Sequence, residues 1–99
     1  MKLAKLVELR MKVNLINEKM ARAEKETEEI TKDQERFREN IEALAKTPDA
    51  KQLIARYIAK ANDQESRLEQ INREKQTMAA EKDNLERELA VEIKNLEVQ

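Results

Sequence analysis

Two pairs of carboxylates are the residues of this chain whose spacing could support chemistry. Glu24 and Glu28 stand four positions apart, as do Glu88 and Glu92. On a helix this spacing places both members of a pair on one face. Their oxygens could bind a hard cation, but such a site needs further ligands that converge from elsewhere. A solvated helix face is therefore the favoured interpretation of both pairs.

The sequence supplies few residues for catalysis. It contains no histidine, no cysteine and no glycine. The common nucleophile and base pairs and the glycine-rich loops that bind phosphate therefore have no counterpart in it. Two helices, the architecture argued below, cannot enclose a pocket of enzymatic size. We expect no catalytic residue, no metal site, no cofactor and no enzymatic activity.

The composition is typical of long helices. Charged residues make up 41% of the 99 residues and hydrophobic residues 39%, with Phe37 and Tyr57 as the two aromatic side chains. This profile favours a coiled coil over a globular domain. The net charge of −1 gives the chain no overall attraction for nucleic acid or for an anionic membrane.

The only proline, Pro48, divides the chain into two halves of helix-forming sequence. Proline cannot donate the hydrogen bond that would continue a helix, and it disfavours the helical conformation at Thr47. Thr47, Pro48 and Asp49 are also suitable residues for the start of a new helix. The sequence thus predicts one hairpin domain over residues 1–99, with helices at about 2–46 and 48–98 and a turn at 47–48.

Hydrophobic residues repeat with a period of seven on both sides of this turn, which predicts a coiled coil. Heptad positions a and d, which face the partner helix, form a seam in each half. In the first helix the seam residues are Leu6, Leu9, Val13, Ile16, Met20, Ala23, Thr27, Ile30, Gln34, Phe37, Ile41 and Leu44. In the second they are Ile54, Tyr57, Ala61, Gln64, Leu68, Ile71, Lys75, Met78, Lys82, Leu85, Leu89, Glu92 and Leu96. Steps of four, four and three from Leu85 through Leu89 and Ile93 to Leu96 resemble a stutter.

The fold class predicted from this pattern is all-α, with two long helices forming an antiparallel coiled-coil hairpin that turns at Thr47-Pro48-Asp49. In the register that we favour, Gln34 meets Gln64 and their amides bond each other. The flanking residues then pair across the helices as Lys12–Glu88, Lys19–Glu81, Asp33–Arg67 and Arg10–Glu86, with Glu26–Glu74 repulsive. A parallel homodimer is the alternative, but it would keep Pro48 inside a continuous helix, at a cost of about 3 kcal/mol or more.

Two surfaces are candidates for binding. The first is an apolar base interface at the open end of the hairpin, where exposed hydrophobic residues mark a contact. Its residues are Leu3, Val7, Met11, Leu15, Val91, Ile93 and Val98. The second is a basic tip that could dock an acidic or phosphate-bearing partner. Its residues are Arg36, Arg38, Lys46, Lys51, Arg56 and Lys60. Scattered surface residues and ordinary solubilising charge are the respective alternatives, and for the tip solubilising charge is favoured.

Three stretches share their order of residues with a known family. They are Gln34-x-Arg36-x-Arg38-x-Asn40-Ile41-x-x-Leu44, then Arg56-Tyr57, then Gln64-Glu65-x-x-Leu68. This order resembles the coiled-coil tail segment of a family of large bacterial proteins catalogued as a domain of unknown function. The resemblance covers about residues 30 to 90. It implies a fragment of a larger bacterial protein, with the cell envelope as one candidate location, and it implies no catalytic residue.

The sequence therefore predicts a structural spacer or a protein–protein interaction arm of a larger bacterial protein. The expected partner is a body domain of the parent protein, or a second copy bound through the base, and a protein partner at the tip is a further option. A nucleic-acid-binding helical arm that uses the basic tip is the alternative function, although nucleic acid is the less favoured partner. No segment has the length of a membrane span or the pattern of a signal peptide. We expect a soluble segment of the bacterial cytoplasm or envelope.

Overall fold

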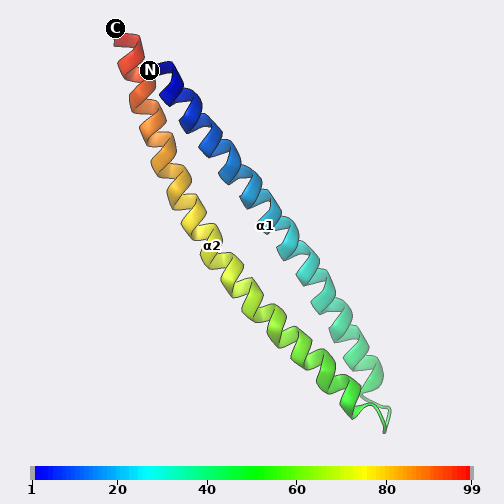
Figure 1. Ribbon diagram of the computed structural model, residues 1–99. Helices are drawn as coiled ribbons and strands as arrows, with labels where there is room; N and C mark the ends of the chain where they lie inside the picture. The colour runs from blue at the N-terminus through cyan, green and yellow to red at the C-terminus, as the bar shows by residue number, and fades with distance from the viewer. Residues whose placement is uncertain (1, 99) are drawn as a thin grey trace. The chain divides into compact units, whose positions relative to one another are not determined.

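The computed structural model describes residues 2–98 and the side chains of residues 3–97. Helix α1 covers Lys2–Leu44 and helix α2 covers Lys51–Val98 (Figure 1). The described residues contain no strand. The predicted all-α class with two long helices is confirmed.

The chain divides into two compact units, each built from both helices. Unit 1 contains Met1–Ala23 and Arg73–Gln99, and unit 2 contains Glu24–Asn72. Within each unit a segment of α1 lies antiparallel to a segment of α2, as expected for a helical hairpin (Figure 1). The chain ends belong to unit 1 and the loop between the helices belongs to unit 2.

The loop between the helices is longer than the sequence predicted. It occupies residues 45–50, whereas a turn at 47–48 was expected. The amide of Thr47 donates a hydrogen bond to the carbonyl of Leu44 (2.9 Å), and the amide of Ala50 donates to the carbonyl of Thr47 (3.3 Å). Two successive turns therefore reverse the chain. Pro48 occupies the second position of the later turn, where its fixed φ angle is favourable.

Ala50, and not Thr47, directly precedes the first residue of α2. Its carbonyl accepts the amide hydrogen of Ile54 at 2.9 Å, which is the first helical hydrogen bond. The Ala50 side chain is buried and has no oxygen that could accept one of the free amide hydrogens of the first turn. Ala50 therefore gives α2 no side-chain cap.

Serine at position 50 is expected to stabilise the protein by about 1 kcal/mol, because its hydroxyl oxygen can accept an amide hydrogen of the first turn. Thermal unfolding followed by circular dichroism measures the effect of Ala50→Ser. The matched control is Ala55→Ser on an exposed position inside α2, which should be neutral or slightly destabilising. Equal effects of the two changes would contradict the capping argument.

The seam predicted from the heptad pattern is confirmed in both units except at Leu96, which is exposed. Every seam position from Leu6 to Leu44 and from Ile54 to Glu92 is buried or half-buried. Leu9 in unit 1 and Ile71 in unit 2 are the two large side chains with the least exposure, 1% each. The ring centroids of Phe37 and Tyr57 lie 5.4 Å apart in unit 2, in a tilted arrangement that favours aromatic contact.

The end of α2, where the sequence suggested a stutter, is the least buried part of the seam. Glu92 is half-buried, whereas Ile93 and the predicted seam residue Leu96 are both 37% exposed. The stutter therefore stays a prediction. Lys82, another polar seam residue, turns its ammonium group toward Glu86 on its own helix (3.9 Å), so its stem stays on the seam while its charge stays near water.

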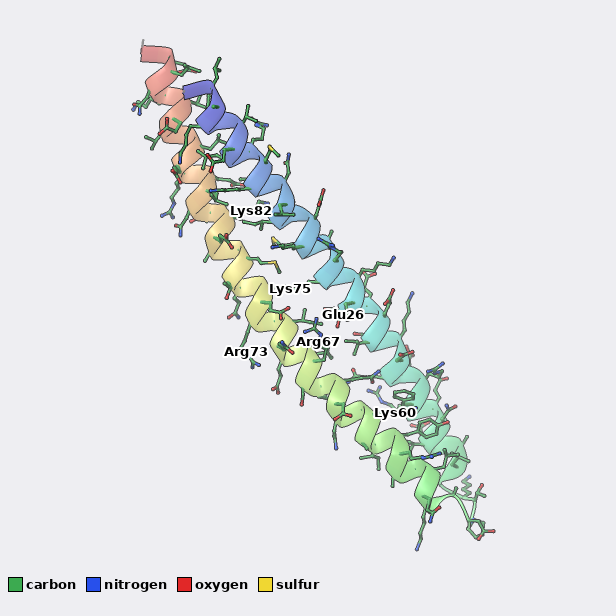
Figure 2. All side chains as sticks on the ribbon, viewed as in Figure 1. Glu26, Lys60, Arg67, Arg73, Lys75 and Lys82 are labelled. Atoms are coloured by element: carbon green, nitrogen blue, oxygen red, sulfur yellow. The ribbon has the colours of Figure 1, made fainter. Side chains whose placement is uncertain are left out.

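The pairs that join the helices differ from the predicted ones. Lys5 Nζ lies 3.4 Å from Glu88 Oε1 in unit 1, where Lys12 was the predicted partner of Glu88. In unit 2, Arg67 binds Glu26 and not Asp33 (Figure 2). The predicted partners pair within α1: Lys12 with Glu8 at 3.1 Å, and Asp33 with Arg36 at 3.5 Å.

The shift has a simple geometric cause. Both new partners on α1 stand seven residues before the predicted ones, and positions seven apart lie on the same flank of a coiled coil. A long side chain can therefore reach either of them. The predicted register centred the chain reversal at Asp49, whereas the observed loop is centred between Thr47 and Pro48. An earlier centre of the reversal brings each residue of α2 closer to a residue that comes earlier in α1, and so favours Lys5 over Lys12 and Glu26 over Asp33.

The predicted amide pair between Gln34 and Gln64 is also wrong. Gln34 Nε2 donates to Glu65 Oε1 at 2.8 Å. A carboxylate is a stronger acceptor than an amide oxygen, so Gln34 gains by this exchange. Gln64 Oε1 is left buried without a hydrogen-bond partner among the described residues. Unit 2 thus contains an unsatisfied acceptor on its seam.

Candidate protein-interaction surface

The apolar side chains predicted to form the base interface are exposed wherever the structure describes them. Exposure is highest on α1, where Leu3 and Met11 are 67% and 65% exposed. Val91 on α2 is 56% exposed and Ile93 is 37% exposed. Val98, the last residue of the predicted interface, lies outside the side chains that the structure describes.

Four of these residues form one line along α1. They stand four positions apart, so each lies about 40° around the helix from the one before it. We call this line the outer row; it consists of Leu3, Val7, Met11 and Leu15. Leu9 and Ile16, which are buried against α2 in unit 1, lie on the opposite side of the same helix. Helix α1 is therefore apolar on two opposite faces in unit 1, and α2 covers only one of them.

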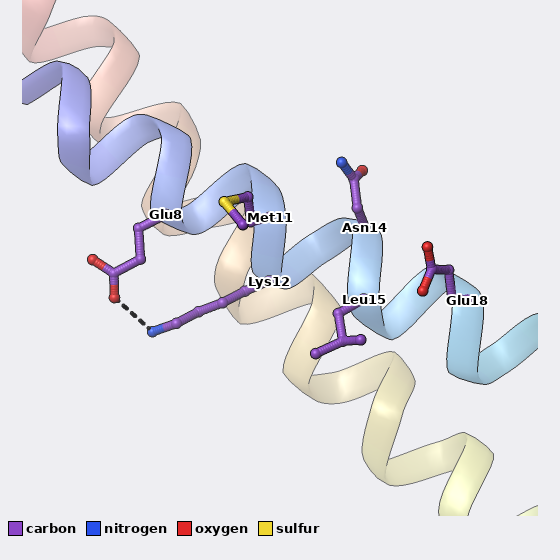
Figure 3. Close-up of a pocket in the computed structure, with 6 residues that line it drawn as sticks. All are labelled: Glu8, Met11, Lys12, Asn14, Leu15 and Glu18. Atoms are coloured by element: carbon purple, nitrogen blue, oxygen red, sulfur yellow. Dashed lines mark ion pairs between the residues drawn. The ribbon is translucent and has the colours of Figure 1, made fainter.

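Part of the outer row lines a shallow hollow on the surface of unit 1 (Figure 3). Met11 and Leu15 supply its apolar lining, and the polar residues around them are Glu8, Lys12, Asn14 and Glu18. Glu8 and Lys12 form an ion pair of 3.1 Å on one flank. The hydrogen bond from Lys12, its charge and the charge of Lys5 lower the pKa of Glu8. The hollow thus combines an apolar lining with an ionised, paired flank.

A second groove lies between the two helices of unit 1. Its lining consists of Leu6, Val7, Arg10, Leu89 and Ile93. The structure therefore brings Val7 and Ile93 together, as expected for one base interface. Val91 lines neither hollow. It stands two residues after Leu89, about 200° around α2, and so points away from the seam. The predicted base interface thus divides between different faces of unit 1.

The basic residues predicted for the tip are all exposed. Two of them lie over the Phe37 ring, with Arg36 Cζ at 5.4 Å and Lys60 Nζ at 6.0 Å from its centroid. Cations over an aromatic face stabilise a fold without any ligand. Arg38 lines a groove with Phe37 and Ile41. For Arg36 and Lys60 the contacts favour a structural role.

The sequence interpretation overlooked two exposed apolar residues in unit 2. Leu53 and Ile58 are 39% and 47% exposed. Their heptad positions, g and e, flank the seam, and this signal could have identified them. The sequence interpretation also gave Glu8 and Glu18 no role and placed Lys12 against Glu88, although all three surround the apolar hollow.

Glu26 and Arg67 form a close ion pair across unit 2. Arg67 Nε lies 2.6 Å from Glu26 Oε2, and its Nη2 lies 2.9 Å from Oε1. The paired hydrogen bonds from Arg67 lower the pKa of Glu26, and partial burial opposes this only in part. A carboxyl group whose pKa is lower in the folded state adds stability above its unfolded-state pKa. That stability is lost as the pH falls through the folded-state pKa.

Arg67→Gln is therefore expected to raise the pKa of Glu26 toward its ordinary value. It should also reduce the part of the stability that disappears on acidification. NMR titration of the Glu26 carboxyl carbon and unfolding at pH values from neutral to acidic measure both effects. Arg56→Gln, at an exposed position of unit 2, is the control. An unchanged pKa of Glu26 in Arg67→Gln would contradict this prediction.

The remaining observations bear on metals, membranes and relatives. Over the described part of the chain, no three or more acidic side chains gather in a way that could hold a metal ion. None of the helices there is long and apolar enough to cross a membrane. Comparisons of the chain with family models, with curated proteins and with solved structures find no match. The function must therefore be argued from the geometry.

Proposed function

We propose that this chain is a protein-interaction arm of a larger bacterial protein, without catalytic activity of its own, and that unit 1 makes the contact. The observation that carries the proposal is the apolar character of α1 on two opposite faces. Leu9 and Ile16 pack against α2, whereas Val7 and Met11 face solvent. A surface helix of a globular protein ordinarily has one apolar stripe, and a helix that is apolar on more than one side is ordinarily covered on more than one side.

The energetics support a covering partner for the outer row. Burying apolar surface contributes about 25 cal/mol for each Å² removed from water. The four side chains of the outer row are all large and about half exposed or more. They are also contiguous along four turns of α1, whereas single exposed hydrophobic residues are common on any protein. A contiguous row is what a partner protein can bury at once.

Site-specific photo-crosslinking in the cells that produce the protein tests the proposal. A photoreactive side chain at Met11 should form covalent products with protein, and these can be identified by mass spectrometry. The same group at Val91 is the matched control, because Val91 is similarly exposed but points away from the outer row. Absence of any product from Met11, or equal products from both positions, would contradict the proposal.

A nucleic-acid-binding arm is the second candidate, and it is favoured by the exposed cations Arg38, Lys46, Lys51 and Arg56 in unit 2. Filter binding of transfer RNA at low salt tests it. Binding that is lost on combined replacement of Arg36, Arg38 and Arg56 by glutamine would support this function. Absence of binding by the unchanged protein would exclude it.

A further inference from the structure

We propose that the outer row binds a second copy of this chain, with α1 of one copy packed antiparallel on α1 of the other. This inference rests on the proposed function and names its partner. The residues that end and flank the outer row select both the partner and the orientation.

Glu18 ends the outer row and disfavours a parallel arrangement. It stands three positions after Leu15 on the same outward face, and it borders the hollow that Leu15 lines (Figure 3). In a parallel pair, each Glu18 would meet the other at the same height on the contact face, where like charges repel. In an antiparallel pair centred between Val7 and Met11, the two glutamates lie at opposite ends of the contact.

The apolar residues of the outer row match under the same symmetry. With the two-fold axis between Val7 and Met11, Val7 of one copy meets Met11 of the other, and Leu3 meets Leu15. A two-fold interface brings one surface against an identical surface, so each contact occurs twice. A row with two central residues and a leucine at each end is suited to this self-pairing.

One charged flank gives more attractive than repulsive contacts in the antiparallel arrangement. Two antiparallel helices in face-to-face contact bring the same flank of each together. Glu8 of one copy then approaches Lys12 of the other, and the contact occurs twice. Both side chains are about half exposed and now pair with each other within α1. Exchange of these partners between copies would need only a change of side-chain rotamer.

The other flank carries one opposing contact. Arg10, which lines the groove with Leu89 and Ile93, would approach Arg10 of the second copy. On the first flank Glu8 also approaches Glu8 of the second copy, because each stands one residue from the two-fold axis. Two repulsions, Arg10–Arg10 and Glu8–Glu8, therefore oppose the two Glu8–Lys12 attractions. The outer row is also short compared with a standard protein interface. We therefore expect a dimer that dissociates on dilution, and we expect Arg10→Gln to tighten it.

Sedimentation equilibrium over a range of concentrations tests the contact surface. The unchanged chain should show an average mass that rises from 11.6 kDa toward twice that value. Met11→Glu should weaken the association at least tenfold, because it places a charge at the centre of the contact. Val91→Glu is the control and should leave the association unchanged. A monomer at all concentrations, or equal losses in the two variants, would overturn the inference.

Mixing two charge variants tests the partner orientation. Glu8→Lys makes this flank wholly positive and Lys12→Glu makes it wholly negative, so each variant alone should associate several-fold more weakly than the unchanged chain. An equimolar mixture should form a heterodimer, because both cross-copy contacts are then between opposite charges. A parallel dimer would gain nothing from this mixture, since Glu8 and Lys12 would not meet. Failure of the mixture to associate better than either variant would overturn the antiparallel arrangement.

Circular dichroism shows whether each variant keeps the helicity of the unchanged chain, and these exposed positions should tolerate the changes. The crosslinking described above separates the two proposals. If the chain remains a monomer while Met11 crosslinks to a different protein, the proposed dimer is contradicted and the proposed function as an interaction arm is supported. If Met11 forms no crosslink, both the proposed dimer and the proposed interaction arm are contradicted.

Discussion

Replacing Ile71 with alanine is expected to lower the free energy of unfolding by about 3 kcal/mol or more and to open unit 2. Ile71 is 1% exposed, and its removal loses its apolar burial and leaves a cavity between the helices. A narrow seam between two helices has few other residues that could fill this space. Urea denaturation followed by circular dichroism measures the loss.

The same reasoning applies to Leu9, which has the same exposure in unit 1. Hydrogen exchange should then show that Ile71→Ala first weakens protection in unit 2 and that Leu9→Ala first weakens it in unit 1. Leu53→Ala, at a position that is 39% exposed, is the control and should cost much less. A loss below about 1 kcal/mol for Ile71→Ala would contradict its role as a main contact of unit 2.

Replacing Gln64 with leucine is expected to stabilise the protein by about 1–2 kcal/mol. Gln64 lies at seam position d, and its Oε1 is buried without a hydrogen-bond partner in the described part of the chain. A buried polar atom without a partner costs about 1–3 kcal/mol, and leucine of similar length removes this cost while adding apolar burial. The midpoint of urea denaturation should therefore rise.

Gln70→Leu provides the comparison for this gain. Gln70 is exposed on the same helix, so leucine there adds hydrophobic surface without removing an unsatisfied group. Gln64→Leu should therefore have a higher free energy of unfolding than Gln70→Leu, by most of the expected gain. A loss of stability in Gln64→Leu would show that the Gln64 amide has a partner in solution that the leucine cannot replace.

The fold could be predicted from the sequence because two strong local signals agree. Pro48 is the only residue that must interrupt a helix, and the heptad pattern fixes which side of each helix is buried. Leu9, Phe37 and Ile71, all buried in the structure, were all predicted seam residues. Burial of a seam depends on the period of the pattern alone, so it does not require the exact alignment of the two helices.

The predictions that were wrong are those that depend on the alignment of the two helices along each other. The pairs Lys5–Glu88 and Glu26–Arg67 replace pairs that are also acceptable in charge, because the same flank recurs every seven residues. The loop also could not be placed, because Thr47 takes part in two turns through backbone hydrogen bonds and α2 begins only after Ala50. The sequence preference of Thr47 for a cap was the weaker factor.

The candidate surface was predicted in composition but not in arrangement. The exposure of Met11, Leu15 and Val91 follows from heptad positions outside the seam. Their grouping as one interface did not follow, because Val91 points away from the seam on α2 while Met11 and Leu15 point away from it on α1. The angle of each residue around its own helix, which the heptad positions already fix, could have separated them.

The loop at residues 45–50 also makes the association of the two helices intramolecular. A short flexible connection keeps its two ends at an effective concentration in the millimolar range. Seam formation is therefore an intramolecular event whose equilibrium does not change on dilution. Cleavage by trypsin after Lys46, an exposed residue of this loop, would turn it into an encounter of two separate peptides. The melting temperature of the nicked hairpin would then rise with peptide concentration.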